Sequence, residues 1–512
     1  MKSDFRLKAF LFGNWRIIRE TRQRLAGAWL VMCWLIASCQ PSGGSLTGAV
    51  APLAGEAQPT SSPEVSLSTA VPTRPAYAPG ELVDYIAQTG DTLPALAVHF
   101  NTSVAEILAA NPFIPANATT LPPGMPMRIP IYYAPFWGPS NQIIPDSLFV
   151  NGPAQVGFDL AEFVSEFPGW IKDYRAYAAE ANRSGAQIIE LVAKNFSISP
   201  RLLLALLEYQ AGALSRPNLP ASEETYLLGN QDWQRKGVYL QLVWAANTLN
   251  NGYYGWRTGK LATFEHLDGR IERPDPWQNA ASVALQYYFS RFLSREDYER
   301  AVSPAGFGRL YTELFGDTLS AQPHLPGSLQ QPEMTLPFLP GITWAYTGGP
   351  HTAWGDGEPL SAVDFAPGSY EGGCTPTDEW ATAVAPGVVA RSEPATVVLD
   401  LDMDGDERTG WTVFYFHLAT EGRASLGKVL QTGDPVGHPS CEGGRATGTH
   451  VHIARKYNGE WIPASGALAF NLDGWVAQDG SRPYLGFLVK NARRIIACDC
   501  ADQDSQIQAG AK

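Results

Sequence analysis

The amino-acid sequence predicts a multidomain α+β protein whose carboxyl-terminal part is an antiparallel β-sheet domain. With 512 residues, the chain is too long for one typical hydrophobic core. Apolar residues recur at three- and four-residue spacing between residues 158 and 317, which indicates helices. The alternating segment 449–453 and the apolar run 411–416 are typical of strands. The formal net charge of -13 argues against a nucleic-acid partner, because such partners favour a basic surface.

The first 39 residues have the pattern of an export signal. Basic residues precede an apolar stretch, 26–36, that is too short to span a membrane comfortably. This stretch ends in Leu-Ile-Ala-Ser-Cys39, which resembles the lipobox of bacterial lipoproteins, where cleavage exposes a cysteine that is then acylated. The resemblance implies lipidation of Cys39 and an exported, membrane-anchored lipoprotein at the bacterial cell envelope. A plain signal peptide with an incidental cysteine, or an uncleaved anchor, would show the same pattern.

Residues 83–132 are expected to form a small βααβ unit, after a Ser-, Pro- and Ala-rich stretch (40–82) that is typical of a disordered linker. The unit resembles a LysM module, a fold that binds N-acetylglucosamine in peptidoglycan and chitin. The resemblance implies a groove between the first strand–helix loop and the second helix–strand loop. The implied glycan-binding residues are Gly90, Asp91, Thr92, Asn111 and Pro112. The alternative is that they only build the turns and that the module is a spacer.

Residues 150–325 are predicted to form a helical domain. The segment 197–207 resembles the entry to the catalytic helix of lysozyme-like lytic transglycosylases. That family requires a Glu-Ser pair before a Gly, whereas this chain has Gln210 there, with Glu208 about 200° away around the helix. We therefore expect a glycan-binding or spacer domain that does not cut sugars. The aromatic-rich segment 244–257 is expected in its core, since helical Trp and Tyr are more often buried than sugar-bound.

Half of the eight histidines gather in one part of the sequence. His450 and His452 lie two residues apart in an alternating run, so a strand places both on one face. His351 follows a Gly-Gly-Pro stretch, Asp364 comes thirteen residues later, and His417 ends an apolar strand. Two neutral imidazoles and a carboxylate are the ligands of a catalytic zinc, with one position left for water. The residues alone do not decide which histidine of the pair would hold the metal.

The motifs GGPH, SAVDF, FYFHL and GTHVHI follow one another within residues 335–480. They resemble those of the lysostaphin-type (M23) zinc endopeptidases that cut cell-wall peptides, and the long His-to-Asp interval fits the beta-lytic branch. This resemblance implies three zinc ligands, His351, Asp364 and His452. It also implies that His417 and His450 are the catalytic histidines, in either order, beside the metal-bound water and the scissile carbonyl.

An acidic segment separates two of the predicted strands. Its carboxylates alternate as at the start of a calcium loop, which makes Ca2+ a second candidate metal at Asp400, Asp402, Asp404 and Asp406. Trp411 occupies the position of the bidentate glutamate that closes such a loop. A solvated acidic hairpin explains the pattern equally well.

The remaining cysteines are candidates for disulfides, because export implies an oxidising compartment. Cys374 and Cys441 lie in predicted loops of the 335–480 region and are a plausible pair. Cys498 and Cys500 lie in the expected carboxyl-terminal extension, 481–512. A bridge between them would close a strained ring, so pairing elsewhere or between molecules is an alternative, and the sequence does not decide the connectivity.

Together these features predict a cell-wall hydrolase. Its LysM module would bind the glycan of peptidoglycan, its helical domain would space the parts or add binding, and its zinc domain would cleave peptide stems or crossbridges. Anchoring raises the local concentration of the enzyme at an insoluble polymer. One alternative is a catalytically silent wall-binding scaffold or activator of another hydrolase. Another is a bifunctional enzyme that also cuts glycan, which Gln210 disfavours.

Overall fold

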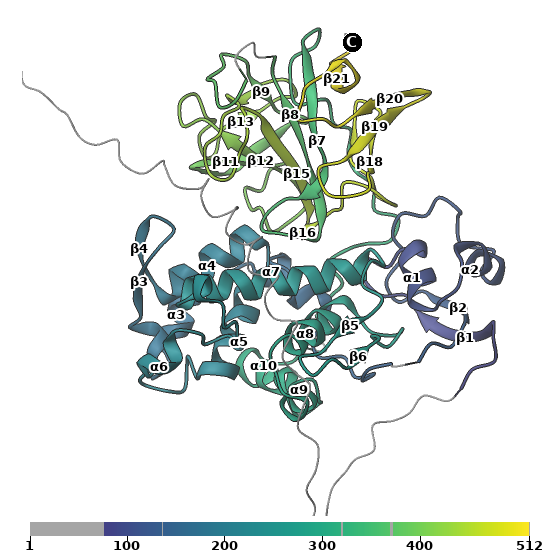
Figure 1. The fold of residues 1–512 in the computed structure, drawn as a ribbon, viewed down its shortest axis with the longest axis vertical. Coiled ribbons are helices and arrows are strands. Elements are labelled where there is room, and N and C mark those ends of the chain that lie inside the picture. The colour runs from purple at the N-terminus through teal and green to yellow at the C-terminus, as the bar shows by residue number, and fades with distance from the viewer. Residues whose placement is uncertain (1–75, 136, 319–320, 369–371, 511–512) are drawn as a thin grey trace, which may run out of the picture. The chain divides into compact units, whose positions relative to one another are not determined.

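The computed structural model describes residues 76–135, 137–318, 321–368 and 372–510 (Figure 1). The expected signal segment, its Cys39 and most of the expected linker lie outside these residues. The described residues belong to one compact unit, in which a small N-terminal module, a helical domain and a β domain follow one another along the chain.

The N-terminal module has the predicted βααβ order. It consists of β1 (Glu81–Ile86), α1 (Leu93–His99), α2 (Val104–Ala110) and β2 (Pro126–Ile131). β1 pairs antiparallel with β2, and Leu96, Phe100 and Ile129 are fully buried between the hairpin and the helices. Thr92 caps α1 by accepting a hydrogen bond from the backbone of Ala95. No single helix of the described residues is long and apolar enough to cross a membrane, and α1 with α2 passes only as a pair bent by 102°.

The helical domain consists of helices and two short hairpins. In chain order these are α3 (Leu160–Ser165), β3 (Arg175–Ala178), β4 (Ala181–Ser184), α4 (Gly185–Phe196), α5 (Pro200–Ala211), α6 (Ala221–Glu224), α7 (Val238–Arg257), β5 (Phe264–Glu265), β6 (Ile271–Glu272), α8 (Ala280–Ser290), α9 (Arg295–Ala301) and α10 (Phe307–Phe315). Helix α5 begins at the predicted Ser199 cap. Leu249, Tyr253 and Tyr254 of α7 are buried, so the aromatic-rich segment lies in the core as predicted.

The β domain is built on a large antiparallel sheet and a smaller one. Its strands are β7 (Thr343–Thr352), β8 (Leu360–Ala366), β9 (Ala381–Thr382), β10 (Gly387–Glu393), β11 (Ala395–Asp400), β12 (Trp411–Leu418), β13 (Val429–Leu430), β14 (Pro435–Gly437), β15 (Val451–Tyr457), β16 (Glu460–Trp461), β17 (Asn471–Leu472), β18 (Trp475–Asp479), β19 (Gly486–Lys490), β20 (Arg493–Ile496) and β21 (Gln506–Gln508). The large sheet has the order β13-β10-β11-β12-β15-β8-β7-β21, with β16 paired to β15, and the smaller one has the order β17-β18-β19-β20. β9 and β14 form a separate pair.

The β domain extends past the boundary that the sequence suggested at residue 480. β19 continues the small sheet, and β21 pairs with β7 at the edge of the large sheet. Residues 481–510 therefore complete the β domain. No linker separates the predicted carboxyl-terminal extension from the rest of the β domain. Its strands are too short for an alternating pattern to be recognised in the sequence.

The two faces of the large sheet have different environments. Ile453 of β15 and Val363 of β8 belong to the core of the β domain. Their neighbours Ala454 and Ala362 point to the opposite face and join the hydrophobic cluster of the helical domain, together with Trp461. Helix α7 passes beside the β15–β16 hairpin (Figure 1), where the Tyr254 hydroxyl accepts a hydrogen bond from the Trp461 backbone at 3.0 Å. The helical domain thus packs directly on one face of the sheet.

A buried ion cluster joins strands β10 and β15 of the large sheet to the loop that contains Glu407. Glu407 accepts hydrogen bonds from Lys456 at 2.8 Å and from Arg391 at 3.0 Å. The Lys456 side chain is 2% exposed, so its charge depends on Glu407 for compensation. Burial would raise the pKa of Glu407, but Lys456 and Arg391 outweigh it and hold that pKa at about 2.

The variant Glu407→Gln should lower the free energy of unfolding at neutral pH by about 3 kcal/mol, because Lys456 and Arg391 lose their buried anion. The pKa of Glu407 in the folded chain is below its unfolded value, so its stabilisation is complete above about pH 4.5 and is lost as the pH falls towards 2. Urea unfolding at several pH values measures both effects. Glu313→Gln, which removes an exposed carboxylate bonded to Arg309, should change neither. An unchanged acid profile in Glu407→Gln would contradict the assignment.

Candidate metal centre

Three neighbouring strands bring His351, Asp364 and His452 together. β15 pairs with β8 so that His452 lies directly opposite Asp364. β8 pairs with β7, and irregular register between Gly348 and His351 brings the His351 ring alongside. All three side chains are at least nine-tenths buried. The alternation of β15 places His452 on the same face as Ala454, two residues from the part of the sheet that the helical domain covers.

The ligand atoms of these residues form a nearly equilateral triangle. Nε2 of His351 and Nδ1 of His452 are 3.0 Å apart, and they lie 3.3 Å and 3.2 Å from Oδ1 of Asp364. Atoms bound tetrahedrally to one zinc at about 2.0–2.1 Å are separated by about 3.3 Å. Oδ1 of Asp364 is buried. Within the described part of the chain, no donor forms a hydrogen bond of normal geometry with it. The donor set and its spacing therefore fit a zinc ion.

Gly348 leaves the room that the Asp364 carboxylate needs. A Cβ atom at position 348 would lie 2.3 Å from Oδ2 of Asp364, closer than any real contact. The next residue, Gly349, accepts a hydrogen bond through its carbonyl from Nδ1 of His351 at 2.8 Å. This bond places the proton of His351 on Nδ1 and leaves Nε2 free to bind a metal.

The electrostatics of the site favour an ionised Asp364 and a neutral His452. Burial would raise the pKa of Asp364, but His351 and His452 outweigh it and hold that pKa well below its usual value. Burial lowers the pKa of His452. At neutral pH the site therefore combines the Asp364 anion with an uncharged His452, and these are protonation states that metal binding requires.

His417 and His450 lie beside the three candidate ligands. Their ring centroids are 4.5 Å apart, and Nε2 of His450 is 4.0 Å from Oδ1 of Asp364. Nδ1 of His417 bonds to the Glu442 carbonyl at 2.8 Å, and Nδ1 of His450 bonds to the Gly448 carbonyl at 2.7 Å. Burial lowers the pKa of His417 to about 4. With Nδ1 protonated, each ring has Nε2 available to accept a proton.

Tyr484 is a further residue of the site that sequence reasoning missed. Its ring stacks on His351, with centroids 4.1 Å apart and planes 21° from parallel, yet its side chain remains 54% exposed. Its φ of +69° is a left-handed conformation that is costly for a residue with a side chain. The Gly349 amide donates to the Tyr484 carbonyl at 2.8 Å, which fixes this position. Only the strand pairing of the last thirty residues brings Tyr484 here, and no local motif signals it.

The candidate glycan residues of the N-terminal module occupy its loops. Gly90 and Asn111 are buried, Asp91 is partly buried, and Pro112 is exposed. Asp91 accepts two hydrogen bonds within its own turn, and Thr92 caps α1. Asn111 bonds to the backbone of the module. Asp91, Thr92 and Asn111 thus have structural contacts, and the part of all five residues in glycan binding stays a prediction.

The acidic hairpin between β11 and β12 holds part of the predicted calcium set together. Carboxylate oxygens of Asp400, Asp402 and Asp404 lie within 4.8 Å of one another. Asp406 instead pairs with Arg408 at 2.6 Å. Burial raises the pKa of Asp400 to about 7, and its Oδ2 accepts a backbone hydrogen bond within the turn. These bonds support the hairpin without an ion, and calcium stays a prediction.

Glu208 and Gln210 both have partners inside the helical domain. Oε2 of Glu208 accepts hydrogen bonds from the Leu214 backbone at 2.6 Å and the Ser215 backbone at 3.2 Å. Nε2 of Gln210 donates to the Tyr288 hydroxyl at 2.8 Å. These contacts give both side chains a role in holding the end of α5.

Comparison with known proteins separates the chain into recognisable regions. A family model for the LasA N-terminal domain matches residues 142–328, and the LysM domain model matches residues 85–130. Protease LasA of Pseudomonas aeruginosa is 26% identical over 342 residues, which are 63% of this chain and 75% of that protein. The beta-lytic metalloendopeptidase of Lysobacter enzymogenes is 28% identical over 140 residues, 26% of this chain and 74% of that protein. The chain is a homologue of LasA and of the beta-lytic metalloendopeptidases.

This homology confirms the resemblance to the beta-lytic peptidases and to LysM modules. In the helical domain, the matching model is that of the LasA N-terminal domain, and the lysozyme-like resemblance stays a prediction. A solved structure described as the M23 metalloprotease pseudoalterin is 26% identical, and the alignment covers 33% of this chain and 96% of that chain with a TM-score of 0.28.

Two disulfides lie in the β domain of this LasA homologue. Cys374 is bonded to Cys441, the pair that the sequence suggested, with Cα atoms 5.7 Å apart. Cys498 is bonded to Cys500, a pairing that the sequence left open. The chain turns at this point, and the Ala501 amide donates to the Cys498 carbonyl at 3.1 Å. The turn brings the two Cα atoms to 5.1 Å, within the span of about 4.4–6.8 Å that a bridge joins.

Replacing Cys374 and Cys441 by serine should lower the free energy of unfolding by about 2–4 kcal/mol, because the bridge joins residues 67 positions apart. It should also reduce activity, since Cys441 precedes the Glu442 carbonyl that orients His417. Chemical unfolding without reductant measures the first effect. The control replaces Cys498 and Cys500, whose bridge spans only 2 positions, and should change stability far less. Equal losses in both double variants would contradict this account.

Proposed function

We propose that the chain is a zinc-dependent endopeptidase that cleaves peptide stems or crossbridges of bacterial peptidoglycan. The observation that carries this proposal is the triangle of Nε2 of His351, Oδ1 of Asp364 and Nδ1 of His452, whose sides of 3.0–3.3 Å match a tetrahedral zinc site. Homology to Protease LasA and to beta-lytic metalloendopeptidases supports the reaction class.

The residues around the triangle supply proton transfer and orientation. Zinc, when bound, polarises a peptide carbonyl and makes water more acidic. His417 is neutral near pH 7, because burial lowers its pKa to about 4, and its Nε2 can accept a proton from the attacking water. His450, on the same side of Asp364, can share this role or stabilise the developing oxyanion. Tyr484 stacks on His351 and holds the ring of that ligand in place.

The N-terminal module supports a peptidoglycan substrate. It matches the LysM domain model, so we propose that it binds the N-acetylglucosamine-containing glycan beside which the peptides lie. Binding an insoluble polymer raises the effective concentration of cleavable peptide near the metal centre. We also propose that the chain is exported and held at the membrane through an acylated Cys39, on the basis of its lipobox-like segment.

Loss of one ligand should remove both metal and turnover. His452→Ala should contain less than about a tenth of the zinc of the parent chain and should release essentially no peptide from purified sacculi, because two remaining donors do not hold a catalytic zinc. Elemental analysis measures the zinc, and mass spectrometry identifies the fragments. The control is His438→Ala, which removes a histidine that bonds to the Glu379 carbonyl outside the triangle. Retained zinc in His452→Ala would refute the ligand set, and bound zinc without released peptides would favour a silent scaffold.

The proposed anchor has its own test. Cys39→Ser should leave the precursor unprocessed and without a lipid, and mass spectrometry of the mature amino terminus should detect acylation only in the parent chain. Cys33→Ser, in the apolar stretch ahead of the cleavage site, is the matched control and should be processed normally. Normal processing of Cys39→Ser would exclude a lipoprotein and leave the peptidase proposal untouched.

A further inference from the structure

Two loops of the N-terminal module border the groove that would receive glycan. The first lies between β1 and α1 and contains Thr89, Gly90 and Asp91, and the second lies between α2 and β2. The Leu121 amide of the second loop donates to the Asp91 carbonyl of the first at 2.8 Å, so the loops lie side by side. Whatever contacts both loops therefore competes with a carbohydrate chain.

Residues 324–329, which we call the bridging segment, are hydrogen-bonded to the second loop. The Thr120 hydroxyl donates to the Pro326 carbonyl at 2.8 Å, and the Ser328 amide donates to the Thr120 carbonyl at 2.8 Å. The Thr119 hydroxyl donates to the Leu329 carbonyl at 2.6 Å. Thr120 is only 5% exposed, so its polar atoms are turned inward to the bridging segment.

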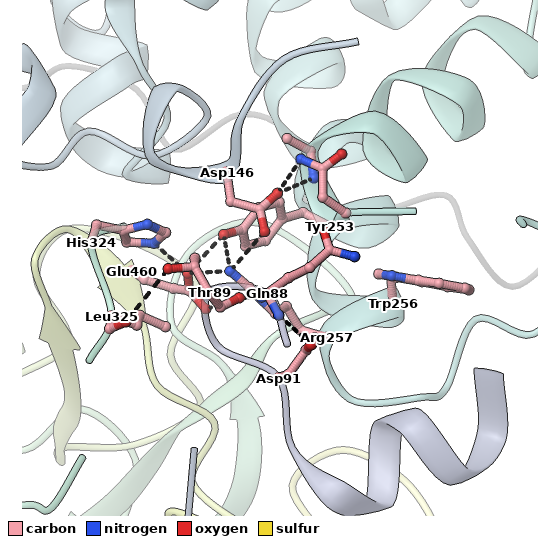
Figure 2. Close-up of polar contacts among 12 residues, drawn as sticks. Gln88, Thr89, Asp91, Asp146, Tyr253, Trp256, Arg257, His324, Leu325 and Glu460 are labelled. Atoms are coloured by element: carbon pink, nitrogen blue, oxygen red, sulfur yellow. Dashed lines mark hydrogen bonds and ion pairs between the residues drawn. The ribbon is translucent and has the colours of Figure 1, made fainter. Parts of the chain in front are cut away.

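The same segment also covers the first loop. The Thr89 hydroxyl bonds to the Leu325 carbonyl at 3.4 Å (Figure 2). A Cβ atom on Gly90 would lie 2.9 Å from Cδ1 of Leu325, so the leucine side chain packs against the bare glycine backbone. Leu325 is 2% exposed and clusters with Leu329 and with Ile462 of the β domain. The bridging segment is thus held between the module and the β domain.

Arg257, at the end of α7, joins the first loop to the other two domains (Figure 2). Its guanidinium donates to the Thr89 carbonyl and forms ion pairs with Asp146 at 3.1 Å and with Glu460 of the β domain at 3.2 Å. His324 of the bridging segment bonds to Glu460 at 2.6 Å. The Arg257 side chain is 7% exposed, and its two partners are 4% and 5% exposed. Breaking one of these ion pairs would leave a buried charge without its partner, which is energetically costly. We therefore expect the contact to open as a whole and not one ion pair at a time.

We propose that the bridging segment and Arg257 close the carbohydrate groove of the chain's own N-terminal module, so that N-acetylglucosamine polymers bind only after both loops separate from them. The inference rests on the proposed glycan binding by this module. Because only the open fraction can bind, the apparent dissociation constant exceeds the intrinsic one by the inverse of that fraction. Glycan and the bridging segment therefore compete, and a polymer rich in sites would draw the module away from the rest of the chain.

The experiment compares full-length chains that all carry His452→Ala, so that the polymer is not digested. Leu325→Ala with Leu329→Ala weakens the segment's packing without altering the module itself. Binding isotherms on chitin beads and on purified sacculi should show roughly tenfold tighter binding for this variant. The matched control is Lys194→Gln, which removes the ion pair with Glu393 between the helical and β domains away from the module. The control should bind like the parent chain.

Amide hydrogen exchange measures, without any ligand, whether the bridging segment stays in contact with the N-terminal module. The backbone amides of Ser328 and Leu329, which donate to Thr120, should exchange slowly in the parent chain and faster in the double variant. Leu329→Ala alone provides a milder change that keeps the Leu325 contact, and it should show both effects more weakly. Faster exchange with unchanged or absent polymer binding would overturn the proposal, and so would equal tightening in Lys194→Gln. Peptide release by chains with intact His452 is measured separately, so either proposal can fail alone.

Discussion

The pairing of β15 with β8 is the constraint on which the rest of the β domain depends. It sets His452 opposite Asp364 and, one residue further, Ile453 opposite Val363. Because side chains alternate along a strand, this one register assigns the polar pair to the face that also meets the helical domain and the apolar pair to the core of the β domain. A shift by one residue would move the imidazole into the core of the β domain and turn the apolar side chain to the opposite face. Hydrophobic burial therefore fixes the chemistry as firmly as it fixes the fold.

The same face carries two kinds of environment within a few ångströms. Beyond His452 the sheet is covered by the helical domain, where Ala454 and Trp461 are buried. The apolar wall lowers the dielectric constant around the triangle, and burial lowers the pKa of His452 and His417. The helical domain contributes to the site without supplying any of its three candidate ligands.

Much of the fold and of the candidate site could be predicted from the sequence, because the informative patterns involve residues that are close together in the chain. Period-two alternation around His452, the Ser199 cap of α5 and the βααβ order of the N-terminal module each depend on neighbouring residues, and each is present in the structure. Contacts between residues that are far apart in the sequence could not be predicted. Tyr484 meets His351 only because β19 and β21 complete the β domain, and Arg257 meets Glu460 only because α7 lies beside β16. The secondary-structure propensity of a segment does not indicate which distant residue its side chains contact.

Gly348 shows that a small change in one side chain could disrupt the candidate metal site while the fold stays intact. Its position in β7 is compatible with any small residue as far as strand pairing is concerned, but the Asp364 carboxylate occupies the space where a side chain would begin. One added methyl group would turn that carboxylate out of the triangle while the sheet kept its pairing. A residue larger than glycine at position 348 would therefore leave the architecture in place and remove the carboxylate from the candidate site.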